Sequence, residues 1–142
     1  MRRQGLAQGW AGHHTCRMAD DPTPRHFTVA EARALLPTVQ AEAERLIDLR
    51  WRLADVQHGL QQGDAGDSGV PEAKALEARV HEVVEALTQQ GVQVKGIAPL
   101  LVDFPAVVEG REGLLCWLER EPDLSYWHPV EIGFVGRRPL PE

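Results

Sequence analysis

The chain has 142 residues, of which 43% are apolar and 25% charged, and no run of eighteen apolar residues, so we expect a cytoplasmic protein without a membrane-spanning helix. It contains 15 basic and 21 acidic residues, and the net charge of −6 argues against general nucleic-acid binding. Two cysteines are too few for a disulfide framework or a structural zinc site.

Residues 1–26 differ from the rest of the chain in charge and composition. They carry four arginines against two aspartates, whereas the remaining chain has a net charge of −8. Three glycines, two prolines and the lack of apolar periodicity predict a disordered tail. Two alternatives concern the same stretch: Met18 is the true start of the protein, or His13, His14 and Cys16 form a metal-binding tract.

A helix is expected to begin soon after this stretch. Thr28 and Glu31 have the spacing of a capping box, and Phe27 before them has the position of a hydrophobic staple. Pro37 removes a backbone donor and clashes with the preceding turn, which predicts a short first helix or a kink just before it. A long helix is then expected over residues 37–61.

Apolar residues recur three and four positions apart in two stretches, which are separated by a glycine-rich loop over residues 62–69. The first seam is Leu46, Leu49, Leu53, Val56 and Leu60, and the second is Ala73, Leu76, Val80, Val83 and Leu87. This heptad spacing is typical of a coiled coil and predicts two helices that pack antiparallel. Pro71 near the start of the second helix and Gly91 after its end fit this assignment.

Ile47, Trp51 and Ala54 form a second apolar stripe on the first long helix. Either the C-terminal part or the first short helix covers Trp51, or the surface of a partner does. Tryptophan is enriched at protein interfaces, so the second alternative makes Ile47 and Trp51 candidate interface residues. The hairpin is otherwise acidic, with a net charge of −5 over residues 27–91 that we interpret as a solvated face.

Short apolar runs replace the helical periodicity in the C-terminal segment. The strand candidates are residues 92–95, 100–104, 114–118 and 126–128. Gly110 indicates a turn, and Pro105 should end its strand or place it at an edge. The expected fold class is therefore α+β: a long antiparallel helical hairpin over residues 27–91 and a small C-terminal antiparallel sheet over residues 92–142, which together form a single domain.

Several residue strings occur in an order that is similar to one known family. They are Phe27–Ala32, Leu35–Pro37, Leu101–Pro105, Gly110–Glu112, Leu115–Trp117, Tyr126–His128, Gly133–Phe134, Gly136–Arg137 and Pro139–Leu140. Over residues 27–140 the chain resembles DUF2203, a bacterial family of small proteins without an assigned function. It departs from the family's pattern at Leu100, Pro129 and Arg138. The resemblance implies no reaction, substrate or cofactor.

Polar residues of the C-terminal segment give the strongest candidate binding site. Asp103 and Arg111 are expected on opposite sides of the hairpin turn, where they can form a charge-assisted hydrogen bond. The candidate ligand-binding residues are Asp103, Arg111, Trp117, Trp127, His128, Glu131 and Arg137. An aromatic-lined groove with two arginines suits a small anion or an acidic peptide. Because histidine binds metals, a metal ion is a further alternative. The same residues also fit a compact core with a salt-bridged rim.

Three functions remain open from the sequence. The first, which we favour, is a non-enzymatic interaction module that forms a homodimer or binds a protein partner through its tryptophan stripe. The second is a small-ligand or metal-binding protein with a site around Asp103, Arg111, His128 and Glu131. The third is a small hydrolase or redox enzyme that uses Cys116 with the same histidine. The sequence has no phosphate-binding loop, Cys-x-x-Cys motif or nucleophile elbow, so no catalytic residue and no cofactor is assigned.

Overall fold

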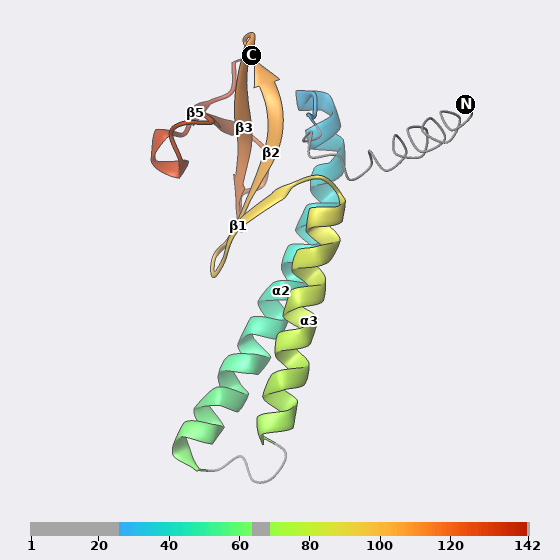
Figure 1. Cartoon of the computed structure of the whole chain (residues 1–142), viewed down its shortest axis with the longest axis vertical. Coiled ribbons are helices and arrows are strands. Elements are labelled where there is room, and N and C mark those ends of the chain that lie inside the picture. Colours follow the sequence, from blue (N-terminus) through green and yellow to red (C-terminus); the bar gives the residue numbers. More distant parts are fainter. Residues whose placement is uncertain (1–25, 64–68, 142) are drawn as a thin grey trace, which may run out of the picture.

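The computed structural model describes residues 26–63 and 69–141. The α+β class predicted from the sequence is confirmed, because two helices lead into a five-stranded antiparallel sheet (Figure 1). The predicted tail, the alternative start at Met18 and the histidine and cysteine tract before it lie outside the described residues. Within these two ranges, no helix is both long enough and apolar enough to cross a membrane.

Helix α2 runs without interruption from Val29 to Gln62. The predicted capping box is confirmed: the Thr28 hydroxyl accepts from the Glu31 N–H and the Glu31 carboxylate accepts from the Thr28 N–H, each at 3.0 Å. The predicted short first helix is wrong, because Pro37 lies inside α2. Leu36 and Val39, on either side of the proline, are buried. The free energy gained from burying them offsets the loss of the backbone hydrogen bond that proline removes.

Helix α3, Gly69–Gln89, packs antiparallel against α2 and gives the predicted hairpin (Figure 1). α2 ends at Gly63, whose φ of 75° is a left-handed conformation that favours glycine. α3 ends in a similar way, since Gly91 has a φ of 97° and its N–H donates to the Thr88 carbonyl. The glycines after each apolar seam therefore mark the helix ends, as the sequence indicates.

The two ends of the hairpin differ in burial. The buried residues of α2 are Ala32, Leu36, Val39, Ala43, Leu46 and Leu49. After Leu49 the seam is only half-buried, as at Leu53, and Trp51 is 71% exposed. The sheet lies beside the end where α2 begins, and the rest of the hairpin projects beyond it (Figure 1). We call this projecting part, residues 51–62 and 69–80, the arm.

The sheet follows the chain order without crossovers. Its strands are β1 (Gln93–Ile97), β2 (Leu100–Val108), β3 (Arg111–Leu118), β4 (Tyr126–Pro129) and β5 (Arg138–Pro139). Each neighbouring pair is antiparallel. The turn predicted at Gly110 is confirmed: Glu109 and Gly110 both have positive φ and form the two-residue turn between β2 and β3.

One face of the sheet packs against the hairpin. Side chains of successive strand residues point to opposite faces, so every second residue joins the core. The core residues of this face include Val102, Phe104, Leu115, Trp117 and Trp127. Phe27, just before α2, packs edge-on against Phe104 with the ring centroids 5.5 Å apart. The intervening residues, which point away from the helices, carry the polar groups described below.

Pro105 does not end β2, so the first of the two sequence-based alternatives, an end of the strand at this proline, is wrong. It pairs with Leu114 of the central strand β3 on one side. On the other side, the pairing with β1 stops at Asp103, so β1 does not require the N–H that Pro105 lacks. The Phe27 N–H instead donates to the Pro105 carbonyl at 2.7 Å. The proline thus occupies a local edge within an interior strand, which is a position where sheets accept it.

Candidate functional site

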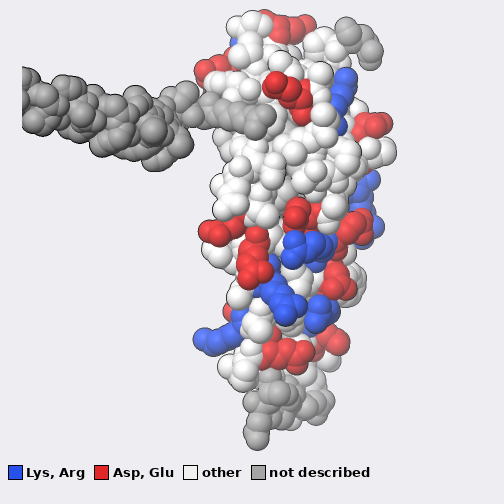
Figure 2. All heavy atoms as spheres, turned by 90° about the vertical axis from the view of Figure 1, so that its right-hand side faces the viewer, with Lys and Arg blue, Asp and Glu red and all other residues white. Residues whose placement is uncertain are grey.

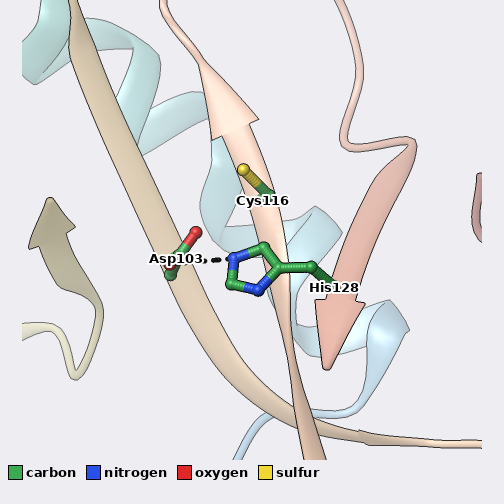
Figure 3. A group of neighbouring side chains, drawn as sticks. All are labelled: Asp103, Cys116 and His128. Atoms are coloured by element: carbon green, nitrogen blue, oxygen red, sulfur yellow. Dashed lines mark hydrogen bonds and ion pairs between the residues drawn. The ribbon is translucent and has the colours of Figure 1, made fainter. Parts of the chain in front are cut away.

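Asp103, Cys116 and His128 meet on the face of the sheet away from the helices (Figure 3). Asp103 and Cys116 pair directly across β2 and β3. His128 of β4 pairs with Leu114, two residues from Cys116, so all three side chains project from the same face. Their exposed fractions are 2%, 0% and 3%, and one donor atom of each lies within 4.8 Å of the others. We call these three residues the Asp-Cys-His cluster.

His128 is held through both of its ring nitrogens. Nδ1 lies 3.0 Å from the Pro129 carbonyl oxygen, and Nε2 lies 3.3 Å from Asp103 Oδ2. A carbonyl oxygen only accepts hydrogen bonds, so Nδ1 carries a hydrogen and donates it. In the neutral ring, Nε2 is then an acceptor that faces a carboxylate oxygen. This contact requires a proton or a cation between the two atoms.

Asp103 has more acceptor capacity than its surroundings use. Oδ2 faces His128 and lies 3.9 Å from Nζ of Lys95. Oδ1 is buried and has no hydrogen-bond partner among the residues that the structure describes. A buried acceptor without a donor costs about 1–3 kcal/mol, and more when it is charged. The cluster therefore contains a strong acceptor that remains unpaired.

Cys116 is the most deeply buried member of the cluster. Its pKa is raised to about 12, chiefly by burial and next by the Asp103 carboxylate, against an opposing effect of Arg137. The thiol is therefore protonated at neutral pH and is a poor nucleophile. The hypothesis of a hydrolase or redox enzyme needs an exposed and reactive Cys116, and this geometry does not support it.

Arg137 lies beside the cluster but is engaged in structural contacts. Its terminal nitrogens donate to both carboxylate oxygens of Glu121, at 2.9 and 2.7 Å, and to the Cys116 carbonyl at 3.2 Å. The guanidinium also stacks on the rings of Tyr126 and Phe134, 4.2 and 4.7 Å from their centroids. These contacts tie the C-terminal segment to the sheet. Both terminal nitrogens are thus used before any ligand is considered.

The other predicted site residues lie outside the cluster. Arg111 is exposed at the start of β3, next to the hairpin turn, whereas the partner of Asp103 across the strands is Cys116. The predicted pairing of Asp103 with Arg111 is therefore wrong. Glu131 is exposed in the turn after β4. Trp117 and Trp127 belong to the core on the opposite face of the sheet.

A small cavity of about 210 Å³ lies beside the cluster. Its lining includes Gln93, Lys95, Pro105 and Leu114. Gln93 pairs with Asp103 and Leu114 pairs with His128, so the cavity and the cluster share neighbouring positions on the same strands. Space for water or a small ligand is thus available next to the buried polar groups.

The two predicted interface residues lie on α2. Trp51 is exposed, so the expectation that the C-terminal part or a first short helix covers it is wrong for the described part of the chain. Ile47 is half-buried and lines a groove of about 480 Å³. Other residues lining this groove include Pro37, Glu44, Trp117, Glu121 and Pro122. Because Ile47 and Trp51 are one helical turn apart, the apolar stripe continues from the arm into the groove.

Comparison with known proteins identifies a family. The family described as "Uncharacterized conserved protein (DUF2203)" matches residues 25–140, nearly the whole chain. The chain belongs to the DUF2203 family. No curated protein and no solved structure matches it. The resemblance noted in the sequence is therefore confirmed, and DUF2203 membership by itself supplies no reaction, substrate or partner.

In this DUF2203 protein, sequence reasoning identified Asp103 and His128 as site residues but did not place Cys116 beside Asp103. The signal that predicts this neighbour is the position of the turn. Counted outward from a two-residue turn at Glu109 and Gly110, the register pairs Asp103 with Cys116. The same count places Arg111 at the tip of the hairpin, away from the cluster.

Proposed function

We propose that this DUF2203 protein is a non-enzymatic interaction module that self-associates through the arm of its helical hairpin. The observation that supports this most directly is the incomplete burial of the regularly spaced apolar side chains on the α2 side of the arm. All residues of α2 are described, and none after Leu49 is buried, although the apolar seam continues to Leu60. Trp51, at the base of the arm, is largely exposed.

Two helices alone cannot enclose a heptad seam. Each helix covers one side of the other, and the flanks of the seam stay in contact with water. The seam residues that are only half-buried are Leu53, Val56, Leu60 and Val80. A second hairpin packed on the first would form a four-helix arrangement and stabilise it by about 25 cal/mol for each Å² of apolar surface removed from water. This complementarity favours a second copy of the chain as the partner.

The hairpin as a whole is acidic, but the arm has as many basic as acidic residues and does not oppose such an association. Acidic and basic side chains alternate along the helical half of the face shown in Figure 2. Within α2, Arg45 pairs with Glu42, and Arg52 pairs with Asp48. Because neighbouring charges compensate one another, apolar contact rather than a field of one sign would govern the association. The proposal includes no nucleic-acid partner, in line with the net charge of −6.

Native mass spectrometry and light scattering of the full-length protein test this proposal. We expect a dimer, and we expect Trp51→Gln to weaken it about 30-fold, since an interface tryptophan contributes about 2 kcal/mol or more. Val135→Gln is the matched control. Val135 is 93% exposed but lies outside the arm, so its substitution should leave the dimer unchanged.

A wild-type protein that stays monomeric at high concentration would contradict self-association. A dimer with equal affinity in the wild type and in Trp51→Gln would show that a different surface forms the contact. In both cases the tryptophan stripe would lose its proposed role.

A further inference from the structure

The Asp-Cys-His cluster combines a carboxylate, a thiol and an imidazole, the three donor types from which protein zinc sites are built. The three residues lie on three adjacent strands, so sheet pairing fixes their relative positions. From this juxtaposition we infer that Asp103, Cys116 and His128 bind a zinc ion. The site lies in the sheet and does not depend on the self-association proposed for the arm.

The hydrogen bonding of His128 leaves the correct nitrogen free for a metal ion. Nδ1 donates to the Pro129 carbonyl at 3.0 Å, which leaves the lone pair of Nε2 facing Asp103. A hydrogen bond from one ring nitrogen to a backbone carbonyl is the arrangement that orients metal-binding histidines. A cation bound to both Nε2 and Oδ2 would replace the unfavourable contact between two acceptors.

The spacing of the donor atoms fits a tetrahedral ion. Two donors that each lie about 2.0 Å from a tetrahedral zinc ion are about 3.3 Å apart. Nε2 of His128 and Oδ2 of Asp103 are 3.3 Å apart. The sulfur of Cys116 lies within 4.8 Å of a donor atom of each of them. In a tetrahedral site the sulfur would lie about 3.5 Å from each of these two atoms, at a zinc–sulfur distance of about 2.3 Å.

The electrostatics of the cluster also suit a cation. Asp103 Oδ1 is buried and has no hydrogen-bond partner in the described ranges. Cys116 would bind as the thiolate and release its proton to solvent. A divalent ion with one carboxylate, one thiolate and a neutral imidazole carries no net charge, so neither Lys95 nor Arg137 would repel the loaded site. A water molecule from the neighbouring cavity, whose lining includes Lys95, would complete the coordination as the fourth ligand.

Metal titration of the full-length protein, first treated with a chelator, tests this inference. With Zn²⁺ we expect one bound ion per chain by elemental analysis after dialysis. With Co²⁺ we expect the near-ultraviolet absorption of a sulfur-to-cobalt charge transfer. Cys116→Ser should abolish this absorption and weaken zinc binding at least about 100-fold. Cys16→Ser is the matched control, because it removes the other cysteine and should change neither result.

Two outcomes of the titration would overturn the inference. The first is that neither Zn²⁺ nor Co²⁺ binds, which would mean that a proton bridges Asp103 and His128. The second is that Cys16→Ser, and not Cys116→Ser, abolishes the cobalt absorption, which would place the ion near the N-terminus.

X-ray absorption spectroscopy of zinc-loaded Cys16→Ser protein gives an answer even if Cys116→Ser does not fold. Cys116 is the one cysteine left in this variant. One sulfur at about 2.3 Å from zinc would support the site. A coordination shell of nitrogen and oxygen alone would overturn it.

Discussion

The two parts of helix α2 in this DUF2203 protein have different surroundings: one part packs against the sheet, and the other belongs to the arm. At the sheet end, α2 contributes six buried residues to the core. Its polar side chains also donate to backbone carbonyls of the C-terminal segment, as Arg33 does to Leu124 and Arg50 does to Ile97. Along the arm, whose α2 residues are all described, none of them is buried. One helix thus serves as a core element at one end and as a projecting surface at the other.

The reactivity of Cys116 should give the largest contrast between the two regions. A pKa of about 12 lowers the thiolate fraction at pH 8 about 10³-fold relative to an ordinary thiol. In metal-free Cys16→Ser protein, we expect iodoacetamide to modify Cys116 at least about 10³-fold more slowly in the folded state than in urea, as measured by mass spectrometry. Ala54→Cys in the same background places an exposed thiol in the arm and should react rapidly at protein concentrations where the chain is monomeric. If iodoacetamide modified both thiols at the same rate in the folded protein, the expected difference in reactivity between the sheet and the arm would be wrong.

Truncation of apolar side chains compares the two regions in free energy. Phe104 is fully buried against Phe27, so Phe104→Ala should lower the free energy of unfolding by about 3–5 kcal/mol. Leu53 is half-buried in the arm, so Leu53→Ala should cost less than about 2 kcal/mol in the monomer. Urea unfolding at several protein concentrations measures both. If Leu53→Ala lowers the free energy of unfolding as much as Phe104→Ala does at high protein concentration, but not at low concentration, the arm is covered by self-association.

Gly113 tests how closely the sheet end is packed. A Cβ atom at this position would lie 2.7 Å from Cε3 of Trp127 and 3.1 Å from the His128 carbonyl oxygen. We expect Gly113→Ala to destabilise the protein by about 1–3 kcal/mol, because the indole and the strand must shift. Gly133→Ala is the control, since its Cβ would meet nothing within 4 Å. Thermal unfolding should separate the two variants, and equal melting temperatures would show that the sheet relaxes without cost.

The ion pair between the two regions should give a smaller effect that depends on pH. The Glu119 carboxylate accepts two hydrogen bonds from Arg50 and one from the Leu100 N–H. These contacts lower the pKa of Glu119, mainly through the Arg50 hydrogen bonds and against the effect of burial. The pair therefore stabilises the fold above the unfolded pKa of about 4.3, and this contribution is lost as the pH falls through the lower folded pKa.

Glu119→Gln measures this contribution. We expect a loss of about 1–3 kcal/mol at pH 7 in urea unfolding and a smaller difference from the wild type at pH 3. Glu131→Gln is the control, because Glu131 is exposed, and it should have almost no effect at either pH. A difference for Glu119→Gln that is equal at both pH values would mean that the carboxylate charge is not what stabilises the junction.

Local patterns predicted most of the elements of this fold. The capping box at Thr28, the two helices with their helical apolar spacing and the turn at Gly110 each depend on residues close in sequence, and all three are confirmed. The predicted helix end before Pro37 and the predicted strand end at Pro105 were wrong for the opposite reason. Burial around Pro37 and the contact of Phe27 with Pro105 come from distant parts of the chain, which local rules do not include.

The candidate site was only partly predictable because it depends on register. Residue type alone singled out Asp103 and His128. A shift in pairing changes which residues meet across the strands, so the site's third member followed only from the exact position of the turn. Whether Trp51 is covered depends on how far the sheet extends along the hairpin. No pattern within the helices encodes that distance.

The junction at Arg50 has a mechanical consequence. Beyond it α2 continues for twelve residues to Gln62, a length of about 18 Å. A tilt of this helical segment by about 10° about Arg50 would displace its end at Gln62 by about 3 Å. Arg50 donates to Glu119, which directly follows β3, the strand that carries Cys116. A tilt of the arm about Arg50 would therefore also displace the end of β3, the central strand of the sheet.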